Sequence, residues 1–283
     1  IALLYGATGS TSFSAIKNFT QEVELTNDTL LLAALALLIV GLAFKVAAVP
    51  FHFWSPDVYQ GSPTPFVAFM ASVVKAAGFA AILRVLYVTL GEYRADWQPV
   101  IYAIAIATLL TGSLLAIVQT DLKRMLAYSS ISHAGYLLVG TQAASDQGVK
   151  AVLFYLATYA FMVIGSFTVV AINAGDTGIH TNLDSLSGLA TRKPLLAITF
   201  TVFLLGQAGI PLTSGFFAKF YVIEAAIEER SYLLAVIAMI AAVIGAFLYL
   251  RILVKVWLSK PEKDLDDTKL HIPTEIGVVL FIA

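Results

Sequence analysis

Long apolar runs with almost no charge recur along this chain of 283 residues and limit the folds open to it. A helix that crosses a bilayer needs about 20 consecutive, mostly apolar residues. The runs are continuous rather than alternating, which favours spanning helices over the strands of a β-barrel. Two short runs, 1–6 and 276–283, predict partial spans. Seven longer runs predict complete spans: 30–49, 65–90, 100–118, 125–144, 151–175, 194–223 and 231–250.

The composition excludes several other classes of protein. Hydrophobic residues make up 59% and charged residues 12%, whereas soluble domains are about 45–50% apolar and about 25% charged. With 17 basic and 18 acidic residues, the chain lacks the basic excess of a nucleic-acid-binding protein. Without cysteine, it cannot form disulfides or ligate iron–sulfur clusters. We expect an all-α polytopic membrane protein that is embedded in the lipid bilayer. We expect it to bind no nucleic acid.

Two of the long runs contain a proline at membrane depth. Pro50 lies within 30–60, and Pro211 lies within 194–228. Proline removes one backbone hydrogen bond and frees a carbonyl, which the bilayer tolerates only where protein or water satisfies it. Broken helices of this kind are typical of transport sites. The alternative is a kink that serves packing only.

The sequence also contains signs of an internal duplication. The segment Gly41–Lys45 resembles Gly215–Lys219, and Gly78–Leu86 resembles Gly245–Leu253, in the same order. Five spans separate each segment from its copy, so the copies have opposite orientations, as in inverted repeats. The chain starts at Ile1 without methionine and stops inside an apolar run. We expect 1–283 to be one transmembrane domain and a piece of a longer chain.

Three lysines lie inside predicted spans, at Lys45, Lys75 and Lys219. A charge at the bilayer centre costs about 2.5–3.5 kcal/mol on insertion scales, and such residues often mark ion or proton paths. A buried lysine can change its protonation when a partner charge moves, so three of them suit a proton relay. The alternative is that each lysine pairs with an acid on another helix and only fixes packing.

A histidine lies in the run Ser129-Ser-Ile-Ser-His133-Ala-Gly-Tyr136. Histidine suits proton transfer near neutral pH, and the side chains of Ser129, Ser130, Ser132 and Tyr136 could hold a water wire beside it. The alternative is a histidine bonded to a backbone carbonyl. The four histidines of the chain lack a metal-ligand spacing, and no phosphate loop or dinucleotide fingerprint is present.

Two further polar residues follow the break at Pro50. His52 and Asp57 could gate or link the two sides of the membrane, or His52 could cap a short half-helix. His180 and His271 fall in predicted loops, where we expect them to be solvated.

Four segments together resemble the subunit N family of proton-pumping NADH–quinone oxidoreductase, respiratory complex I. The first is Val49-Pro-Phe-His-Phe-Trp-Ser-Pro-Asp-Val-Tyr-Gln-Gly-Ser-Pro-Thr-Pro65. The others are Asp121-Leu-Lys-Arg-Met-Leu-Ala-Tyr-Ser-Ser130, His133-Ala-Gly-Tyr136 and Gly209-Ile-Pro-Leu-Thr-Ser-Gly-Phe-Phe-Ala-Lys219. The resemblance covers nearly the whole chain in order.

The resemblance implies an antiporter-like bundle of fourteen helices with two inverted five-helix repeats and two broken helices. The chain then resembles the end of the sixth helix to the start of the fourteenth, with 1–90 as the end of the first repeat and 100–258 as the second. Lys45, Lys75 and Lys219 match the lysines of the seventh, eighth and twelfth helices, and His133 matches the polar position of the tenth. A glutamate of the fifth helix, which the family pairs with the seventh-helix lysine, would precede Ile1.

The resemblance also implies a function. Quinone reduction in another subunit would drive protons along the lysines and His133 of this chain. Other subunits would bind NADH, FMN, iron–sulfur clusters and quinone, so we expect no cofactor and no metal here. The partners would be the antiporter-like subunit M and small membrane subunits such as K. The location would be a bacterial inner membrane, or a thylakoid or organellar inner membrane.

Three alternatives remain open on the sequence. A stand-alone cation–proton antiporter shares the lysines and the broken helices. A photosynthetic relative of complex I shares most of the motifs. A structural subunit with inert lysines would assemble in the same way but would move no protons.

Overall fold

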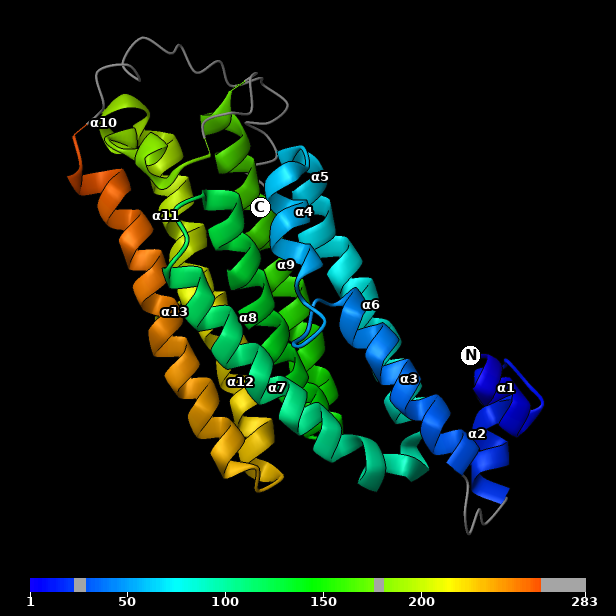
Figure 1. Cartoon of the computed structure of the whole chain (residues 1–283). Helices are drawn as coiled ribbons and strands as arrows, with labels where there is room; N and C mark the ends of the chain where they lie inside the picture. Colours follow the sequence, from blue (N-terminus) through cyan, green and yellow to red (C-terminus); the bar gives the residue numbers. More distant parts are fainter. Residues whose placement is uncertain (23–28, 176–180, 261–283) are drawn as a thin grey trace.

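The computed structural model describes residues 1–22, 29–175 and 181–260, and these residues are almost entirely helical (Figure 1). The partial span predicted at 276–283, His180 and His271 lie outside the described residues. The N-terminal part contains α1 (Ala2–Thr8), α2 (Phe13–Glu22), α3 (Thr29–Lys45), α4 (Trp54–Gly61), α5 (Thr64–Phe69) and α6 (Lys75–Leu83). The larger bundle contains α7 (Arg94–Ile117), α8 (Leu122–Gln142), α9 (Asp146–Ala174), α10 (Leu189–Arg192), α11 (Pro194–Ala208), α12 (Ser214–Glu228) and α13 (Tyr232–Leu258).

Among the described residues, four continuous helical segments are long and apolar enough to cross a membrane: Thr64–Thr89, Gly91–Ile117, Asp146–Ala174 and Tyr232–Leu258. Two shorter apolar helices, α3 and α11, each end beside a break. The count differs from the seven predicted runs for a physical reason. The run 30–49 forms only the 17-residue α3, α8 carries too many polar side chains to qualify by hydropathy, and the run 194–223 is divided between α11 and α12.

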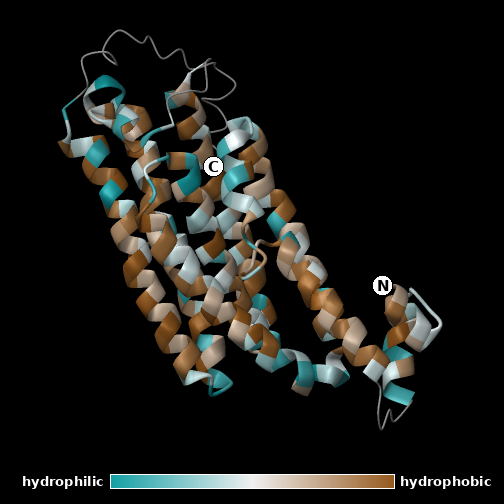
Figure 2. Cartoon of the chain, viewed as in Figure 1, coloured by the Kyte–Doolittle hydropathy of each residue, from teal (hydrophilic) through white to brown (hydrophobic). Residues whose placement is uncertain are grey.

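The apolar side chains on the outside of the bundle show that this is a multi-pass membrane protein. Val243 on α13 is 73% exposed and Val202 on α11 is 61% exposed, as expected for helices that face lipid rather than water. Figure 2 shows hydrophobic residues along the length of α13 and α3, while hydrophilic residues gather at the two ends of the bundle.

Helix α8 occupies the centre of the bundle, with nearly every residue buried. It packs against α4, α7, α9, α12 and α13. Its contact with α7 depends on two glycines, because a Cβ atom on Gly112 would lie 2.4 Å from the main-chain nitrogen of Ser132, and one on Gly135 would lie 2.8 Å from Leu109. This close approach allows the Ser113 and Ser132 hydroxyls to hydrogen-bond over 2.8 Å.

Both proline-containing segments are interrupted. α3 ends at Lys45 and α4 begins at Trp54, and Pro50 lies in the connection. α11 ends at Ala208 and α12 begins at Ser214, with Pro211 between them. Each connection contains one non-glycine residue with a positive φ, Ala47 (58°) and Leu212 (76°). Such backbone conformations are unfavourable for L-residues and concentrate at functional sites.

Candidate functional site

Lys75 lies inside the bundle and is 4% exposed. It is the first residue of α6, directly after a π-helical turn at Met70–Val74. Wide turns of this kind often occur at functional positions. The Nζ atom of Lys75 donates to the main-chain oxygen of Ser130 and, over 2.5 Å, to the Ser130 hydroxyl. It also lies 5.8 Å from the ring centre of Tyr159, so the ring face stabilises the ammonium group.

His133 lies on α8 one turn beyond Ser130 and is 3% exposed. Both of its ring nitrogens have partners: Nδ1 lies 2.7 Å from the Tyr155 hydroxyl, and Nε2 lies 3.0 Å from the Tyr249 hydroxyl. Its ring also packs against that of Tyr159, with 4.7 Å between the ring centres. Tyr159 therefore contacts both His133 and Lys75.

Lys219 is 7% exposed and holds together the two halves of the second broken segment. From the second turn of α12, its Nζ donates to the main-chain oxygens of Gln207 (2.9 Å) and Ala208 (2.8 Å) at the end of α11. The last carbonyls of a helix lack intrahelical partners and carry partial negative charge. The ammonium group of Lys219 satisfies two of them and also lies 5.2 Å from the ring centre of Tyr136.

A small cavity of about 10 Å³ is bordered by both His133 and Lys219. This volume is at the lower limit for one water molecule. The hydroxyl of Tyr249, which lies on the cavity wall, also contacts that of Ser129. The polar residues that line the cavity are Ser113, Ser129, Ser132, His133, Tyr136, Lys219 and Tyr249. Within the described chain, neither Lys75 nor Lys219 has a carboxylate within ion-pair distance.

The third lysine, Lys45, was predicted to be buried, but the structure places it on the surface. Lys45 is exposed on the surface of the described chain, because it is the last residue of α3, a helix at the edge of the bundle (Figure 1). Its aliphatic stem contacts Gly78 of α6, where a Cβ atom would lie 3.6 Å from the Lys45 Cγ. Lys45 is therefore next to the helix that carries Lys75, but it does not belong to the buried cluster.

The two polar residues after the first break lie in different surroundings. His52 is buried against the ring of Phe53, and its Nδ1 has no hydrogen-bond partner among the described residues. The side chain of Asp57 is 71% exposed and forms an ion pair with Arg124 over 2.6 Å. This pair joins α4 to the first turn of α8, where Arg124 also donates to Gln60.

All four predicted water-wire residues have direct protein partners, since the hydroxyl of Ser130 accepts from Lys75 and that of Ser132 contacts Ser113. The hydroxyl of Ser129 contacts that of Tyr249, and the hydroxyl of Tyr136 donates to the main-chain oxygen of Ala238 over 2.9 Å. No group of three or more histidine, aspartate or glutamate residues in the described part of the chain could hold a metal ion.

Sequence reasoning missed the residues that surround the charged groups from other helices. Tyr155, Tyr159 and Tyr249 hold His133, and Gln207 fixes the end of α11 to α9 by donating to Met162 and Ser166. The tyrosines at mid-span were a sequence signal that could have indicated these residues. Tyrosines in membrane helices favour the water interface, and a tyrosine buried at mid-span needs a polar partner.

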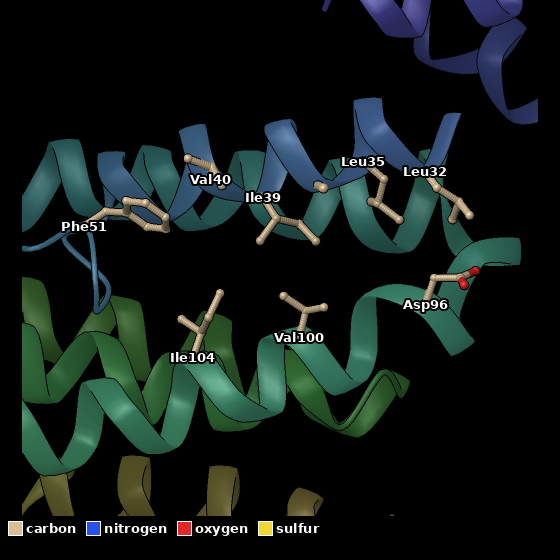
Figure 3. A pocket seen from close by; sticks show the side chains of 9 residues that line it. Leu32, Leu35, Ile39, Val40, Phe51, Asp96, Val100 and Ile104 are labelled. Atoms are coloured by element: carbon tan, nitrogen blue, oxygen red, sulfur yellow. The ribbon is translucent and has the colours of Figure 1, made fainter. Parts of the chain in front are cut away.

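A separate apolar groove of about 370 Å³ runs between α3 and α7 (Figure 3). Its walls include Leu35, Ile39, Val100 and Ile104, and the carboxylate of Asp96 lies at one end. None of the candidate proton-transfer residues lines this groove.

Comparison with known proteins decides the family. Residues 1–245 match the family described as NADH:quinone oxidoreductase/Mrp antiporter, transmembrane. The chain belongs to this family. The match includes Lys45, Lys75, His133 and Lys219, so the whole cluster lies in the part of the chain that family members share.

Among family members, the resemblance to subunit N is confirmed. The chain is 48% identical over 274 residues to NADH-quinone oxidoreductase subunit N 3 of Streptomyces griseus, covering 93% of this chain and 50% of that protein. The chain therefore spans about half the length of the curated relatives it matches.

Solved structures of similar chains have the same fold. A chain of respiratory complex I from Thermus thermophilus with bound aureothin has a TM-score of 0.82 and 35% identity, covering 99% of this chain and 59% of that one. A chain of the Mrp complex from Dietzia sp. DQ12-45-1b has a TM-score of 0.84 and 28% identity, covering 92% and 48%. The antiporter-like, all-helical fold is thus confirmed.

Proposed function

We propose that this chain is part of subunit N, the antiporter-like membrane subunit of proton-translocating NADH–quinone oxidoreductase, and that protons cross it through Lys75, His133 and Lys219. The family match and the relatives named subunit N support this proposal. The chain would be a subunit of an enzyme without performing redox chemistry itself. NADH, FMN, iron–sulfur clusters and quinone would be bound by other subunits.

One observation carries the proposal: a histidine lies between two buried lysines that are held by neutral oxygen atoms. Lys75 is bonded to Ser130, and Lys219 is bonded to the end of α11. A lysine paired with a carboxylate would remain charged, because losing the proton would leave an unpaired buried anion. A lysine held by carbonyls and hydroxyls can release and regain a proton without leaving such an anion.

The broken segment gives Lys219 a fixed electrostatic environment. The C-terminal end of α11 places partial negative charge beside the amine. A charge that arrives on a neighbouring group would add to this field and change the interaction energy of the amine's proton. Quinone chemistry elsewhere in a complex could then drive proton movement along the cluster by electrostatic coupling alone.

Lys45 would connect this cluster to the preceding part of the path. The family pairs the lysine at this position with a glutamate of its fifth helix, and we propose the same pairing here. The exposure of Lys45 on the described chain and its contact with Gly78 of α6 support this arrangement. Proton exchange between Lys45 and Lys75 would follow when that acid moves or changes charge.

We further propose the domain organisation that the internal duplication indicates. Residues 1–90 would end a first inverted repeat, and 100–258 would form the second, within one transmembrane domain over 1–283. The seven predicted spans would then include α8 and the two interrupted segments, in addition to the four long apolar helices. The position of one break before α4 and another before α12 supports this division.

Partners and location follow from the same proposal. The chain would work in a multi-subunit membrane complex beside antiporter-like subunit M and small subunits such as K. We propose a bacterial inner membrane as its location. A thylakoid or organellar inner membrane is the alternative, if the host complex is a photosynthetic or mitochondrial counterpart.

A second candidate is a cation–proton antiporter, because the Mrp complex of Dietzia contains a chain with the same fold. An experiment on membrane vesicles that contain the full-length subunit in its complex separates the two functions. Acidification is recorded after addition of NADH, and separately after a sodium or potassium gradient is imposed, for wild type and Lys219→Ala. Loss of NADH-driven acidification alone supports the complex I function, while loss of cation-driven exchange alone supports the antiporter.

A further inference from the structure

Two tyrosine hydroxyls from different helices hold the two ring nitrogens of His133. Tyr155 of α9 contacts Nδ1, and Tyr249 of α13 contacts Nε2. Tyr155 and Tyr249 are buried, 1% and 2% exposed. Neither belongs to the segments in which the sequence indicated proton-transfer residues.

This pairing has a chemical consequence for the histidine. A neutral imidazole has one N–H donor and one acceptor nitrogen, whereas a hydroxyl group can both donate and accept. Both tautomers of His133 therefore keep two hydrogen bonds, and so does the imidazolium ion, which donates from both nitrogens. The ring can gain or lose a proton without leaving either nitrogen unpaired and without changing its position.

Only one of the two tyrosines leads toward Lys219. The hydroxyl of Tyr249 contacts that of Ser129, and both residues line the cavity that also borders Lys219. Lys219 itself donates to the carbonyls of Gln207 and Ala208, and the hydrogen bonds of His133 are those to the two tyrosines. Of the two hydrogen bonds of His133, the one to Tyr249 is therefore the one whose partner hydroxyl belongs to a residue that borders the same cavity as Lys219.

We propose that the Tyr249 hydroxyl transfers the proton between His133 and Lys219, and that Tyr155 is a positioning residue that holds the imidazole for this transfer. The proposal rests on the proton-translocating function proposed above. It adds a residue of α13 to a path that otherwise consists of lysines and one histidine.

The transfer conserves atoms and charge. The Nε2–H bond of protonated His133 breaks as its proton moves to the Tyr249 oxygen. The original O–H bond of Tyr249 breaks at the same time, and that proton passes through one water molecule of the cavity to the neutral amine of Lys219. The imidazolium becomes imidazole, the amine becomes ammonium, and Tyr249 ends as a neutral hydroxyl.

The test uses membrane vesicles that contain the complete complex with the full-length subunit. Tyr249→Phe and Tyr155→Phe each remove a hydroxyl and keep the ring. Tyr87→Phe is the matched control, because the Tyr87 hydroxyl donates to the main-chain oxygen of Thr141 rather than to the cluster. NADH-driven proton uptake is measured in H₂O and in D₂O, with complex assembly checked on native gels.

We expect Tyr249→Phe to lower proton uptake about tenfold or more, since positioned proton donors contribute at least about 10²-fold to many reactions. The H₂O/D₂O rate ratio should rise as proton transfer becomes limiting. Tyr155→Phe should lower uptake less, and Tyr87→Phe should match the wild type. Reduced uptake by Tyr249→Phe with an unchanged isotope ratio would indicate a structural role and overturn the proposal.

Two further variants, Lys219→Ala and Tyr249→3-fluorotyrosine, separate failure of the Tyr249 proposal from failure of the proposed function. If Lys219→Ala abolishes uptake while Tyr249→Phe matches Tyr87→Phe, the transfer role of Tyr249 is wrong and the proposed function stands. If Lys219→Ala also leaves uptake unchanged, the proposed function itself is wrong. If Tyr249→Phe does not assemble, Tyr249→3-fluorotyrosine keeps the hydroxyl and the packing but makes the hydroxyl more acidic. A changed uptake rate then supports transfer through Tyr249, and an unchanged rate contradicts it.

Discussion

Lys219 donates from Nζ to the main-chain oxygen of Ala208 over 2.8 Å, across the break between α11 and α12. The same amine therefore stabilises the end of a half-helix and occupies the proposed proton path. These two roles make different demands on the side chain. The structural role needs a donor with positive charge, whereas proton transfer needs a group that can lose its proton.

Arginine at position 219 separates these roles, because guanidinium donates hydrogen bonds but is not deprotonated in proteins. We expect Lys219→Arg to keep the assembled complex close to wild-type thermal stability and to lower proton uptake about tenfold or more. Lys219→Ala should lower both. The measurements are the melting temperature of the purified complex and NADH-driven uptake in vesicles. Wild-type uptake by Lys219→Arg would limit Lys219 to the structural role.

Gly209 is the C-terminal cap of α11, and two features of the structure require glycine there. Its φ is 80°, and a Cβ atom would lie 2.9 Å from the Cδ atom of Lys219. We expect Gly209→Ala to destabilise the fold by about 1–2 kcal/mol from its left-handed backbone alone and to displace the Lys219 side chain. We expect a lower melting temperature of the purified complex and a lower rate of NADH-driven proton uptake.

Gly41→Ala is the matched control for that substitution. Gly41 lies within α3, and a Cβ atom there would have no heavy atom within 4 Å. Alanine favours a helix over glycine by up to about 1 kcal/mol, so the stability should stay equal or rise. Equal stability of both variants would show that the backbone at Gly209 is not constrained.

The ion pair of Asp57 and Arg124 tests the sequence-based hypothesis that Asp57 gates or links the two sides of the membrane. Because the carboxylate is largely exposed, the pair should contribute only about 0–1 kcal/mol. We expect Asp57→Asn, Arg124→Gln and the double variant to keep wild-type proton uptake and nearly wild-type stability. A loss of uptake in assembled Asp57→Asn complexes would support the gating role instead.

The general fold was predictable from the sequence because the bilayer demands long apolar helices. The central position of α8 was harder to predict, because hydropathy alone gives no reason to bury a polar helix more completely than its apolar neighbours. Its burial follows from packing: Gly112 and Gly135 allow α7 to approach closely, and the side chains of His133, Ser129 and Ser132 form hydrogen bonds to other helices.

The candidate site was predictable to the extent that a charge inside a span is costly. Lys75 and Lys219 could be identified in this way, but their partners could not, because Ser130 and Ala208 contribute main-chain oxygens that any residue would supply. Lys45 satisfied the same sequence criterion and yet is exposed in the described chain. Its environment depends on which helix covers the edge of α3, and the sequence of α3 does not encode that.

The central claim is that Lys75 takes part in proton translocation through this subunit. The most direct measurement records NADH oxidation and the acidification it drives in the same vesicles, for wild type, Lys75→Ala and Lys75→Arg, with assembly confirmed. The account predicts that both variants translocate fewer protons per NADH than the wild type, because neither side chain can exchange a proton at this position. Assembled variants that keep the wild-type ratio would contradict it.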